Sequence, residues 1–328
     1  MPKKIRWGIL GTGSITHKFA EGLQVLPDAS LAAVGSRNMA TADKFADEFD
    51  IPVRHGSYES LAEDPDIDVV YVGTPHPMHL PNSVLCLTHG KAVLCEKPFT
   101  VNRKQTEELI AVARREKRFL MEAMWTRFLP VITQTRQWIQ EGLIGEPRMV
   151  QADFGFRAWI NEEHRLFSPE FAGGGLLDVG VYCVSLASMV FGGPPTEVKA
   201  LAALGETGVD EQIAAVLGYP GGRLALVSSA IRTNSPHEAR ILGEDGMILL
   251  HPPFWRGDRA TLCVDGKDPL EAHCPFEGNG YNCEAAAVMD CLRAGQLEHP
   301  VMPLDESLTI MDTMDRIRAE WGLKYPME

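Results

Sequence analysis

The sequence predicts an α/β protein in which a doubly wound parallel sheet is followed by an α+β domain on a large open, mostly antiparallel sheet. Three observations lead to this prediction. Over residues 1–123, short and continuously apolar runs alternate with helical stretches, as in strands covered on both faces. A glycine-rich turn joins the first run to the first helix. Over residues 124–328, strand-like segments follow one another through short turns that contain Gly and Pro.

The first domain, residues 1–123, is expected to hold five buried strands and four helices. The strands are Ile5–Leu10, Ser30–Gly35, Val69–Gly73, Ala92–Cys95 and Phe119–Met121, and the helices are Thr16–Val25, Ala40–Phe49, Leu80–Thr88 and Lys104–Glu116. Strands that alternate with helices of this length form βαβ units, and these units build a parallel sheet.

The second domain, residues 124–328, is expected to begin with a helix, continue with six strands and end with two helices. The helices are Leu129–Glu141, Tyr281–Ala294 and Leu304–Trp321, and the strands are Arg148–Arg157, Glu197–Leu204, Gln212–Tyr219, Arg223–Ile231, Glu238–Gly243 and Met247–Leu250. Apolar stretches such as Leu224–Val227 exceed what a solvated face tolerates. We therefore expect a second copy to cover this sheet, in a homodimer or a higher homo-oligomer.

The composition is that of an ordinary globular protein, with 45% hydrophobic and 23% charged residues among 328. The net charge of −13 would repel a phosphate backbone, so nucleic-acid binding is not expected. No apolar run reaches the roughly 18–20 residues of a membrane span, and the basic start, Met1–Trp7, leads into a strand rather than a signal peptide. Seven scattered cysteines argue against disulfides and a metal site and favour the cytoplasm.

The turn after the first strand is a candidate phosphate loop. Gly11 permits the tight turn, Gly13 allows the backbone to approach a pyrophosphate, and the helix that begins at Ser14 and Ile15 supplies free N–H groups. This is the dinucleotide-binding fingerprint of a Rossmann fold. Its third small position is Thr16, which we expect to loosen the packing of helix on strand. A simple strand-to-helix turn is the alternative, but the strand, the helix and the next strand are all in place.

The end of the second strand bears on the choice between NAD and NADP. An acidic residue there would hold the ribose 2′-hydroxyl of NAD. This sequence has no carboxylate in that segment: Ser36 can donate to a 2′-phosphate, and Arg37 can pair with its charge. The sequence therefore favours NADP, with a solvated surface arginine as the alternative.

Two further segments end strands at the sheet edge where open α/β folds bind their ligands. They contain Thr74, Pro75, His76 and His79 after one strand, and Glu96, Lys97 and Pro98 after the next. The ammonium of Lys97 is placed to meet the nicotinamide ribose and a substrate hydroxyl. The alternative is a surface lysine in a turn.

Together these motifs resemble the glucose-fructose oxidoreductase/inositol dehydrogenase/MocA family, and the resemblance covers nearly the whole chain. It rests on the Gly-x-Gly turn, on Thr-Pro-His-x-x-His at residues 74–79 and on Glu-Lys-Pro at residues 96–98. Met121–Phe128, Arg165–Phe167, Gly173–Tyr182 and Pro300–Ser307 resemble one branch, the dimeric dihydrodiol dehydrogenases and NADP-dependent D-xylose dehydrogenases. Most members outside this branch have His where Tyr182 stands. The resemblance implies an NAD(P)-dependent oxidoreductase of CH–OH groups in carbohydrate metabolism, which dimerises through its C-terminal sheet.

Gly173–Gly175 introduces a helix that carries Asp178 and Tyr182, whose spacing places both side chains on one face. Oxidation of an alcohol needs a base for the hydroxyl proton while hydride leaves to the nicotinamide. A neighbouring ammonium lowers the pKa of a phenol toward neutrality. The resemblance therefore implies Tyr182 as acid/base, Lys97 as its activating cation and Asp178 as a substrate-hydroxyl or orienting partner. The alternative is core packing with a buried hydroxyl; hydride chemistry requires no metal.

The resemblance also suggests residues that contact the substrate and cofactor. Trp125, Phe154 and Trp255 are candidates beside Asp178, because an aromatic wall suits the apolar faces of sugars and arene diols. Trp125 is the preferred candidate, although a single Trp is more often a core residue. Arg165 matches a family position that reaches the cofactor, with a structural salt bridge as the alternative. We expect His164 and His237 to be structural.

The sequence thus predicts an NADP-dependent dehydrogenase that oxidises a secondary alcohol or cyclic hemiacetal of a sugar or trans-dihydrodiol. An aldose 1-dehydrogenase is preferred to a dihydrodiol dehydrogenase. One alternative is a non-catalytic NADP-binding sensor, which the presence of Lys97, Asp178 and Tyr182 argues against, since a binder needs only the phosphate loop. Another is a sugar oxidoreductase or redox glycosidase that keeps its cofactor bound.

Overall fold

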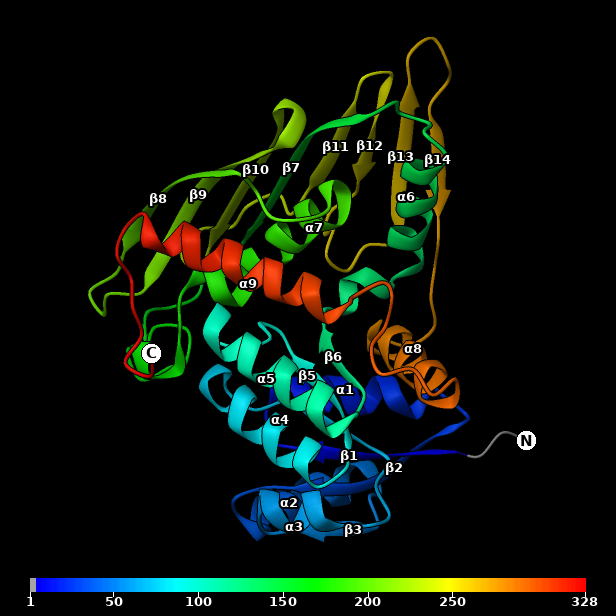
Figure 1. Cartoon of the computed structure of the whole chain (residues 1–328), viewed down its shortest axis with the longest axis vertical. Coiled ribbons are helices and arrows are strands. Elements are labelled where there is room, and N and C mark those ends of the chain that lie inside the picture. Colours follow the sequence, from blue (N-terminus) through cyan, green and yellow to red (C-terminus); the bar gives the residue numbers. More distant parts are fainter. Residues whose placement is uncertain (1–3) are drawn as a thin grey trace. The chain divides into compact units, whose positions relative to one another are not determined.

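The structure, a computed structural model, describes residues 4–328, so the first three residues of the basic start lie outside the described part. The chain forms two compact units. The first comprises the residues up to Thr100, Lys104–Phe128 and Glu277–Ser307, and the second comprises Val101–Arg103, Leu129–Phe276 and Leu308–Glu328. Each unit is built on one sheet, and the sheet of the second unit is the larger (Figure 1).

The sheet of the first unit has six strands in the order β3-β2-β1-β4-β5-β6, and its strand pairs are parallel. Its strands are β1 (Ile5–Leu10), β2 (Ala29–Gly35), β3 (Val53–His55), β4 (Val69–Val72), β5 (Ala92–Glu96) and β6 (Leu120–Ala123). Its helices are α1 (Ser14–Gln24), α2 (Met39–Phe49), α3 (Tyr58–Glu63), α4 (His79–Thr88), α5 (Arg103–Glu116) and α8 (Tyr281–Arg293). The predicted doubly wound Rossmann sheet is confirmed. The strand order reverses between β1 and β4, where such sheets bind ligands.

Helix α8 is a return of the chain to the first unit from far along the sequence. It packs against α1 and the short helix Trp125–Phe128. The approach to α1 is close at Gly22, where a Cβ atom would lie 3.1 Å from the backbone nitrogen of Asn282. The predicted boundary after residue 123 places α8 in the second domain. The apolar face of α8 does not indicate which of the two sheets the helix belongs to, so the sequence carries no sign of this return.

Thr16, at the third position of the phosphate-loop fingerprint, does not loosen the packing of α1 on the sheet, and that expectation was wrong. Its side chain is fully buried, and its hydroxyl donates to the carbonyl oxygen of Gly13 at 2.7 Å. Its methyl group lies 2.4 Å from the place that a Cβ atom would take at Gly73. Gly73 has no side chain, so the methyl group of Thr16 fits beside it. A smaller residue at position 16 is therefore not needed for close packing.

The sheet of the second unit has eight strands in the order β14-β13-β12-β11-β7-β10-β9-β8. Its strands are β7 (Pro147–Gly155), β8 (Glu197–Leu204), β9 (Asp210–Tyr219), β10 (Arg223–Ala230), β11 (Ala239–Gly243), β12 (Gly246–Leu250), β13 (Arg259–Val264) and β14 (Leu270–His273). β10 runs parallel to β7, and the other pairs are antiparallel. The prediction of a large, mostly antiparallel sheet is confirmed.

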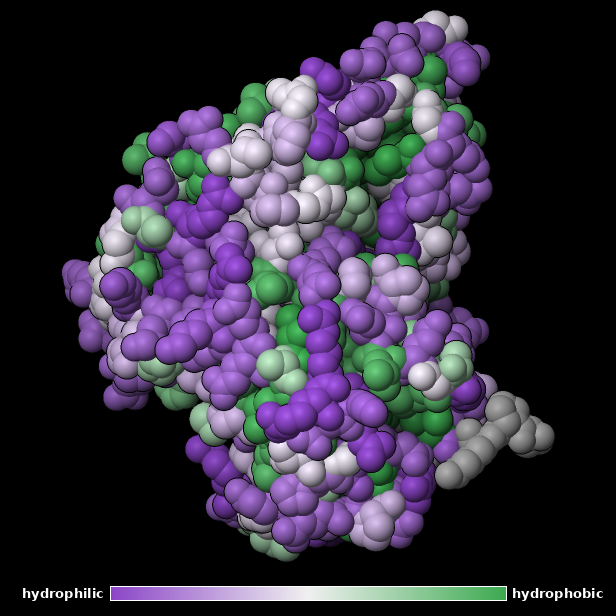
Figure 2. All heavy atoms as spheres, viewed as in Figure 1, coloured by the Kyte–Doolittle hydropathy of each residue, from purple (hydrophilic) through white to green (hydrophobic). Residues whose placement is uncertain are grey.

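Helices cover one face of this second sheet. They are α6 (Pro130–Gln140), which contacts β13 and β14, and α7 (Val181–Phe191), which contacts β7 and β10. A further helix, α9 (Leu304–Ala319), belongs to this unit from Leu308 onward. Along β10, Ala225 and Val227 are buried whereas Leu224 and Leu226 between them are 37% and 38% exposed. The other face of the sheet is therefore open in this chain. On the molecular face shown in Figure 2, hydrophilic residues dominate, with hydrophobic ones scattered among them.

One helical stretch, Pro169–Phe191, is apolar and long enough to cross a membrane by those two measures alone. Of its most apolar window, 89% is buried inside the protein. It contains the whole of α7, which packs on the sheet. Burial of this kind is what the core helix of a globular unit shows.

Candidate active site

A cavity of about 340 Å³ lies in the first unit, where the strand order reverses. It is lined by Gly11, Thr12, Gly13, Ser36, Arg37, Asn38, Thr41, Tyr58, Gly73, Thr74 and Pro75. These residues follow the carboxyl ends of β1, β2 and β4 or lie at the starts of α2 and α3. Gly11, Gly13, Ser36, Arg37, Thr74 and Pro75 are six of the residues that the sequence predicted to bind a cofactor. The structure brings these six together.

The phosphate loop forms one end of this cavity. Gly11 has φ +103°, which favours glycine, and its N–H donates to the carbonyl oxygen of Gly35 at 2.9 Å. Helix α1 starts at Ser14 without a side-chain cap on its N–H groups. A Cβ atom at Gly13 would meet nothing within 4 Å. The start of the helix is thus open to an anion such as a pyrophosphate, and this half of a dinucleotide fits.

The other end of the cavity gathers hydrogen-bonding groups and a cation. The hydroxyls of Ser36 and Thr41 are 2.6 Å apart, and Asn38 caps α2 by accepting the N–H of Ala40 at 2.8 Å. Tyr58 hydrogen-bonds with Arg37; burial raises the pKa of its phenol, and Arg37 opposes that rise. None of the described residues that line the cavity is acidic, which suits a phosphate.

Five lining residues, Thr12, Asn38, Thr41, Tyr58 and Gly73, were not among the predicted cofactor-binding residues. Of these, Asn38 could have been recognised from the sequence, because it lies just before a predicted helix and Asn is a common N-cap residue. Nothing in the local sequence indicates that Tyr58, at the start of α3, reaches back to the end of β2.

Glu96 fixes the start of the loop that carries Lys97. Its carboxylate accepts the hydroxyl of Tyr71 at 2.5 Å and the backbone N–H of Lys97 at 3.1 Å. The ring of Tyr71 stacks on Phe19 with 3.7 Å between the centroids. Glu96 is 4% exposed and turned inward. These contacts support the loop that carries Lys97, and the predicted contact of Glu96 with the cofactor stays a prediction.

His79 joins the same loop to its neighbour. Nδ1 lies 2.8 Å from the carbonyl oxygen of Pro98, and Nε2 lies 2.8 Å from that of Thr74. Burial lowers the pKa of His79 to about 4, so the ring is neutral at pH 7 and donates its single N–H to one of the two carbonyls. Both ring nitrogens thus contact backbone carbonyl oxygens, and the predicted contact of His79 with the cofactor stays a prediction. His76 packs beside it, with 5.8 Å between ring centroids, and its own cofactor role stays a prediction.

Trp125 lies inside the first unit rather than on its surface. It is 2% exposed and stacks on Tyr281 of α8 with 4.5 Å between the ring centroids. Trp125 is thus a core residue, the alternative that was weighed against a substrate contact. The predicted contact of Trp125 with a substrate stays a prediction.

Glu284, three residues beyond Tyr281 on α8, is a buried acid that the sequence analysis missed. It is fully buried, and neither carboxyl oxygen has a hydrogen-bond partner within residues 4–328. Burial and the field of Glu96 raise the pKa of Glu284 well above its usual range. Acidic residues in helices usually face water, so the sequence offers no sign of this one.

In the second unit, the glycine turn leads into a π-helical turn, Leu176–Gly180, and then directly into α7. The N–H of Val181 donates to the carbonyl oxygen of Leu176, five residues back. An unbroken α-helix was the expectation, and the wider turn is a common feature of functional sites. Asp178 lies in the π-helical turn and Tyr182 is the second residue of α7.

Asp178 and Tyr182 are nearly buried, at 5% and 6% exposure. Oδ1 of Asp178 accepts from Nη1 of Arg165 at 2.7 Å. The guanidinium of Arg165 is half exposed while the carboxylate is buried, so the pair fixes Asp178 from the solvent side. The salt bridge considered for Arg165 is present, and its predicted contact with the cofactor stays a prediction.

An aromatic group surrounds Tyr182. Phe154 stacks on Trp255 with 4.6 Å between centroids, and the ring of Tyr182 is 5.4 Å from Phe154 and 6.3 Å from Trp255. His237 lies 4.8 Å from Phe154 and contacts the carbonyl oxygen of Gly155 through Nε2 at 2.6 Å. The structure thus brings together Asp178, Tyr182, Phe154 and Trp255 within one unit. His237 has the structural contact expected of it and also belongs to this wall.

No metal centre is evident in the described chain. Within residues 4–328, no three His, Cys, Asp or Glu side chains are grouped so that they could hold a metal ion. The seven cysteines are all free.

Comparison with known proteins identifies the family. Residues 5–124 match the oxidoreductase family with an NAD-binding Rossmann fold, and residues 132–249 match the GFO/IDH/MocA C-terminal domain. The chain belongs to the GFO/IDH/MocA family. It is accordingly an NAD(P)-dependent oxidoreductase, and the family resemblance drawn from the sequence is confirmed.

The chain is 39% identical to the trans-1,2-dihydrobenzene-1,2-diol dehydrogenase of Bos taurus, over 99% of each chain. Among solved structures, an aldose-aldose oxidoreductase from Caulobacter crescentus has a TM-score of 0.89 at 24% identity, covering 97% of each chain. A 3-ketoreductase from Actinomadura kijaniata in complex with NADP has a TM-score of 0.85 at 25% identity, covering 97% of this chain and 98% of the other. The high TM-scores confirm the predicted fold class.

The buried His79 predicts a pH dependence of stability. Its pKa is about 4 in the folded chain against an ordinary value of 6.5, so the folded state resists protonation. Its contribution to the free energy of unfolding is complete above pH 6.5 and is lost as the pH falls toward 4. The loss amounts to about 3 kcal/mol.

Urea unfolding of the wild-type protein and the His79→Gln variant at several pH values measures this contribution. The stability gap between the two proteins should narrow as the pH falls, because the variant lacks the titrating ring. His89→Gln, which alters an exposed ring, serves as the control and should follow the wild-type protein. A gap between wild type and His79→Gln that is constant with pH contradicts the prediction.

Proposed function

We propose that the chain is an NADP-dependent dehydrogenase that oxidises a secondary alcohol or cyclic hemiacetal of a sugar or a trans-dihydrodiol. One observation carries the proposal: Asp178 and Tyr182 stand on one helical segment, and Tyr182 lies against the aromatic pair Phe154 and Trp255. A non-catalytic sensor would have no use for a buried acid and a phenol beside such a wall. The 39% identity to a named dihydrodiol dehydrogenase over 99% of both chains supports the proposal.

NADP, when bound, supplies the carbon that accepts the hydride. In this proposal the open start of α1 at Ser14 and Ile15 holds the pyrophosphate. Ser36 and Arg37 hold the 2′-phosphate, in a cavity whose described lining carries no acid to repel it. The solved 3-ketoreductase relative binds NADP, which supports this choice of cofactor over NAD.

In this proposal the second unit provides the base, the orienting acid and the aromatic wall for the alcohol, and the first unit provides Lys97. Tyr182 takes the hydroxyl proton as base, and the ammonium of Lys97 stabilises the resulting phenolate. Asp178, fixed by Arg165, accepts a hydrogen bond from the substrate and orients it. Phe154 and Trp255 pack against its apolar face.

Two substrate classes are candidates: an aldose and an arene trans-dihydrodiol. The bovine relative is named for a dihydrodiol and is 39% identical to this chain, which favours the dihydrodiol more than the sequence alone did. The relative from Caulobacter crescentus is named for aldoses at 24% identity. Absorbance of reduced cofactor, followed with a panel of both substrate types and either NADP or NAD, distinguishes them and also reveals a protein that never releases its cofactor.

We also propose that the protein works in the cytoplasm. Its seven cysteines are all free, and three of them, Cys86, Cys95 and Cys183, are fully buried. Burial raises the pKa of these thiols, so they stay protonated and unreactive. Thiols in this state suit a reducing compartment.

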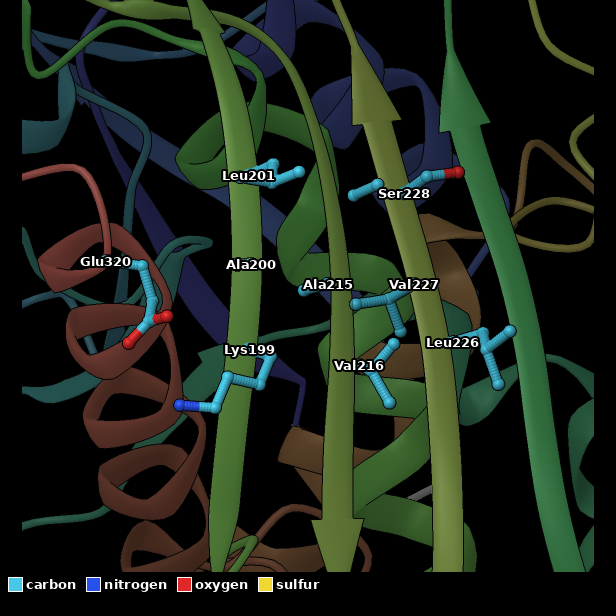
Figure 3. Close-up of a pocket in the computed structure, with 10 residues that line it drawn as sticks. Lys199, Ala200, Leu201, Ala215, Val216, Leu226, Val227, Ser228 and Glu320 are labelled. Carbon is cyan, nitrogen blue, oxygen red and sulfur yellow. The ribbon is translucent and has the colours of Figure 1, made fainter.

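We further propose that two copies pair through the open face of the large sheet. A groove of about 660 Å³ runs along this face on β8, β9 and β10. Figure 3 shows Leu201, Val216 and Leu226 on these strands, with Lys199 and Glu320 at one side. Leu201 is 82% exposed, which is costly for a large apolar side chain in water. The amine and the carboxylate complement the same pair on a second copy, which favours a two-fold dimer.

Arg37→Ala is expected to lower affinity for NADP and leave affinity for NAD nearly unchanged. The guanidinium pairs only with the 2′-phosphate, so its loss costs roughly 1.5–3 kcal/mol, about ten- to a hundredfold in Kd. Quenching of tryptophan fluorescence on titration with each cofactor measures the change. Arg54→Ala, which removes an exposed arginine paired with Asp43 and Asp47 outside the cavity, is the control. Equal weakening of both cofactors by Arg37→Ala would refute the assignment.

Tyr182→Phe is expected to lower turnover by about 10²–10⁴-fold, the usual worth of a placed acid/base, while NADP binding and folding survive. Lys97→Met should be nearly inactive, and Lys97→Arg should not restore the rate, since a planar guanidinium does not take the place of an ammonium. The double variant should be scarcely worse than either single one.

Tyr219→Phe, which changes a buried phenol elsewhere on β9, is the control for Tyr182→Phe and should retain the wild-type rate. A Tyr182→Phe enzyme that keeps more than about a tenth of wild-type turnover would eliminate Tyr182 as the acid/base.

The pair of substitutions Leu201→Asp and Val216→Asp is expected to convert a dimer into a monomer, because it places charges in the apolar groove. Light scattering at micromolar concentration should give twice 36.1 kDa for the wild-type protein and 36.1 kDa for the variant. Leu297→Asp, at an exposed leucine outside this sheet, should leave the mass of the wild-type species unchanged. A wild-type mass of 36.1 kDa contradicts the proposal.

A further inference from the structure

The helical segment that presents Asp178 and Tyr182 begins without a side-chain cap from its own neighbours. Its first N–H groups meet a carboxylate from a different element instead. Leu176 donates its N–H to Oδ2 of Asp210 at 2.6 Å, and the N–H of Gly175 also hydrogen-bonds to this carboxylate. Asp210 is the first residue of β9 and is fully buried.

The glycine turn is shaped around this carboxylate. Gly174 has φ +110°, and a Cβ atom there would lie 2.3 Å from Oδ1 of Asp210. A Cβ atom at Gly175 would lie 3.5 Å from Oδ2. Oδ1 has no hydrogen-bond partner within the described chain. A side chain at Gly174 would therefore crowd the place that the carboxylate occupies, whereas the distance at Gly175 is an ordinary van der Waals contact.

Other contacts hold the backbone of the same turn. The N–H of Gly174 donates to the carbonyl oxygen of Leu166 at 2.9 Å, and the hydroxyl of Tyr325 donates to that of Gly173 at 2.6 Å. These contacts fix the approach to the turn. Asp210, in contrast, binds the first N–H groups of the helical segment itself. One of them belongs to Leu176, two residues before Asp178.

We propose that Asp210 is a positioning residue of the active site: by anchoring the start of the helical segment to β9, it sets where the side chains of Asp178 and Tyr182 stand. The inference rests on the proposed function for its catalytic consequence. Physically, a carboxylate at the start of a helix satisfies unpaired N–H groups and lies at the positive end of the helix dipole. Because Asp210 belongs to a strand, it joins the helix to the sheet.

The charge of Asp210 changes near neutral pH. Burial raises its pKa to about 7, against the hydrogen bonds from Leu176 and Gly175 and the positive charge of Arg318. Arg318 itself pairs with Asp315 and Glu328, and the phenol of Tyr325 is the other titratable group that faces Asp210. Deprotonation of Asp210 strengthens the anchor, because hydrogen bonds to a charged acceptor are the stronger ones.

Asp210→Ala is expected to lower kcat at least tenfold while Kd for NADP, which is set in the first unit, stays unchanged. Asp210→Asn keeps an acceptor but loses the charge, so it should fold, lose less of kcat, and lack the ionisation near pH 7 in its pH profile. Leu217→Ala, a buried truncation on the same strand, is the control: it should lower the melting temperature and leave kcat unchanged.

Hydrogen exchange separates this inference from the proposed function. The amides of Leu176 and Asp178 should exchange faster in Asp210→Ala, or in Asp210→Asn if the alanine variant does not fold, than in Leu217→Ala. This holds even if no substrate of the panel reduces NADP, in which case only the proposed function fails. Exchange no faster than in Leu217→Ala, or wild-type kcat in both Asp210 variants of an active enzyme, overturns the positioning role.

Discussion

Unpaired N–H groups at the start of a helix are the constraint on which both units of this protein depend. Each helix leaves its first N–H groups without partners of its own. In the first unit, α1 begins at Ser14 beside a glycine with open space around it, so these groups are left for an anionic ligand. In the second unit, the groups at Leu176 and Gly175 are met by Asp210. The same physical need thus produces a binding site in one unit and a fixed support in the other.

Buried polar groups hold the loop between β5 and α5 in the same manner. Glu96 joins Tyr71 to the backbone of Lys97, and His79 lies between the carbonyls of Thr74 and Pro98. A buried polar group without a partner is costly, so these contacts resist displacement of the loop. Lys97 stands between the two anchored residues, Glu96 and Pro98, and its backbone is therefore well fixed.

Much of this arrangement was predictable from local sequence. Continuous apolar runs located β1, β2, β4, β5 and β6, and the carboxyl ends of parallel strands meet, so Gly11, Arg37 and Thr74 were expected near one another and line one cavity. β3 was missed because it has three residues, largely exposed, and β14 because it is short and mostly exposed. β13, which is largely buried, was also missed. The inward turn of His79 and Glu96 and the contact of Asp210 with Leu176 depend on packing between distant segments, which no local pattern records.

In the proposed reaction, this chain moves a hydride from an alcohol carbon to NADP. This transfer is tested most directly by mass spectrometry of the cofactor after incubation with D-xylose deuterated at C1 and with a ring-deuterated trans-dihydrobenzenediol. At least one substrate should yield NADPH carrying one deuterium on the nicotinamide ring, because the hydride comes directly from the substrate carbon. Unlabelled NADPH, or no NADPH from either substrate, would contradict it.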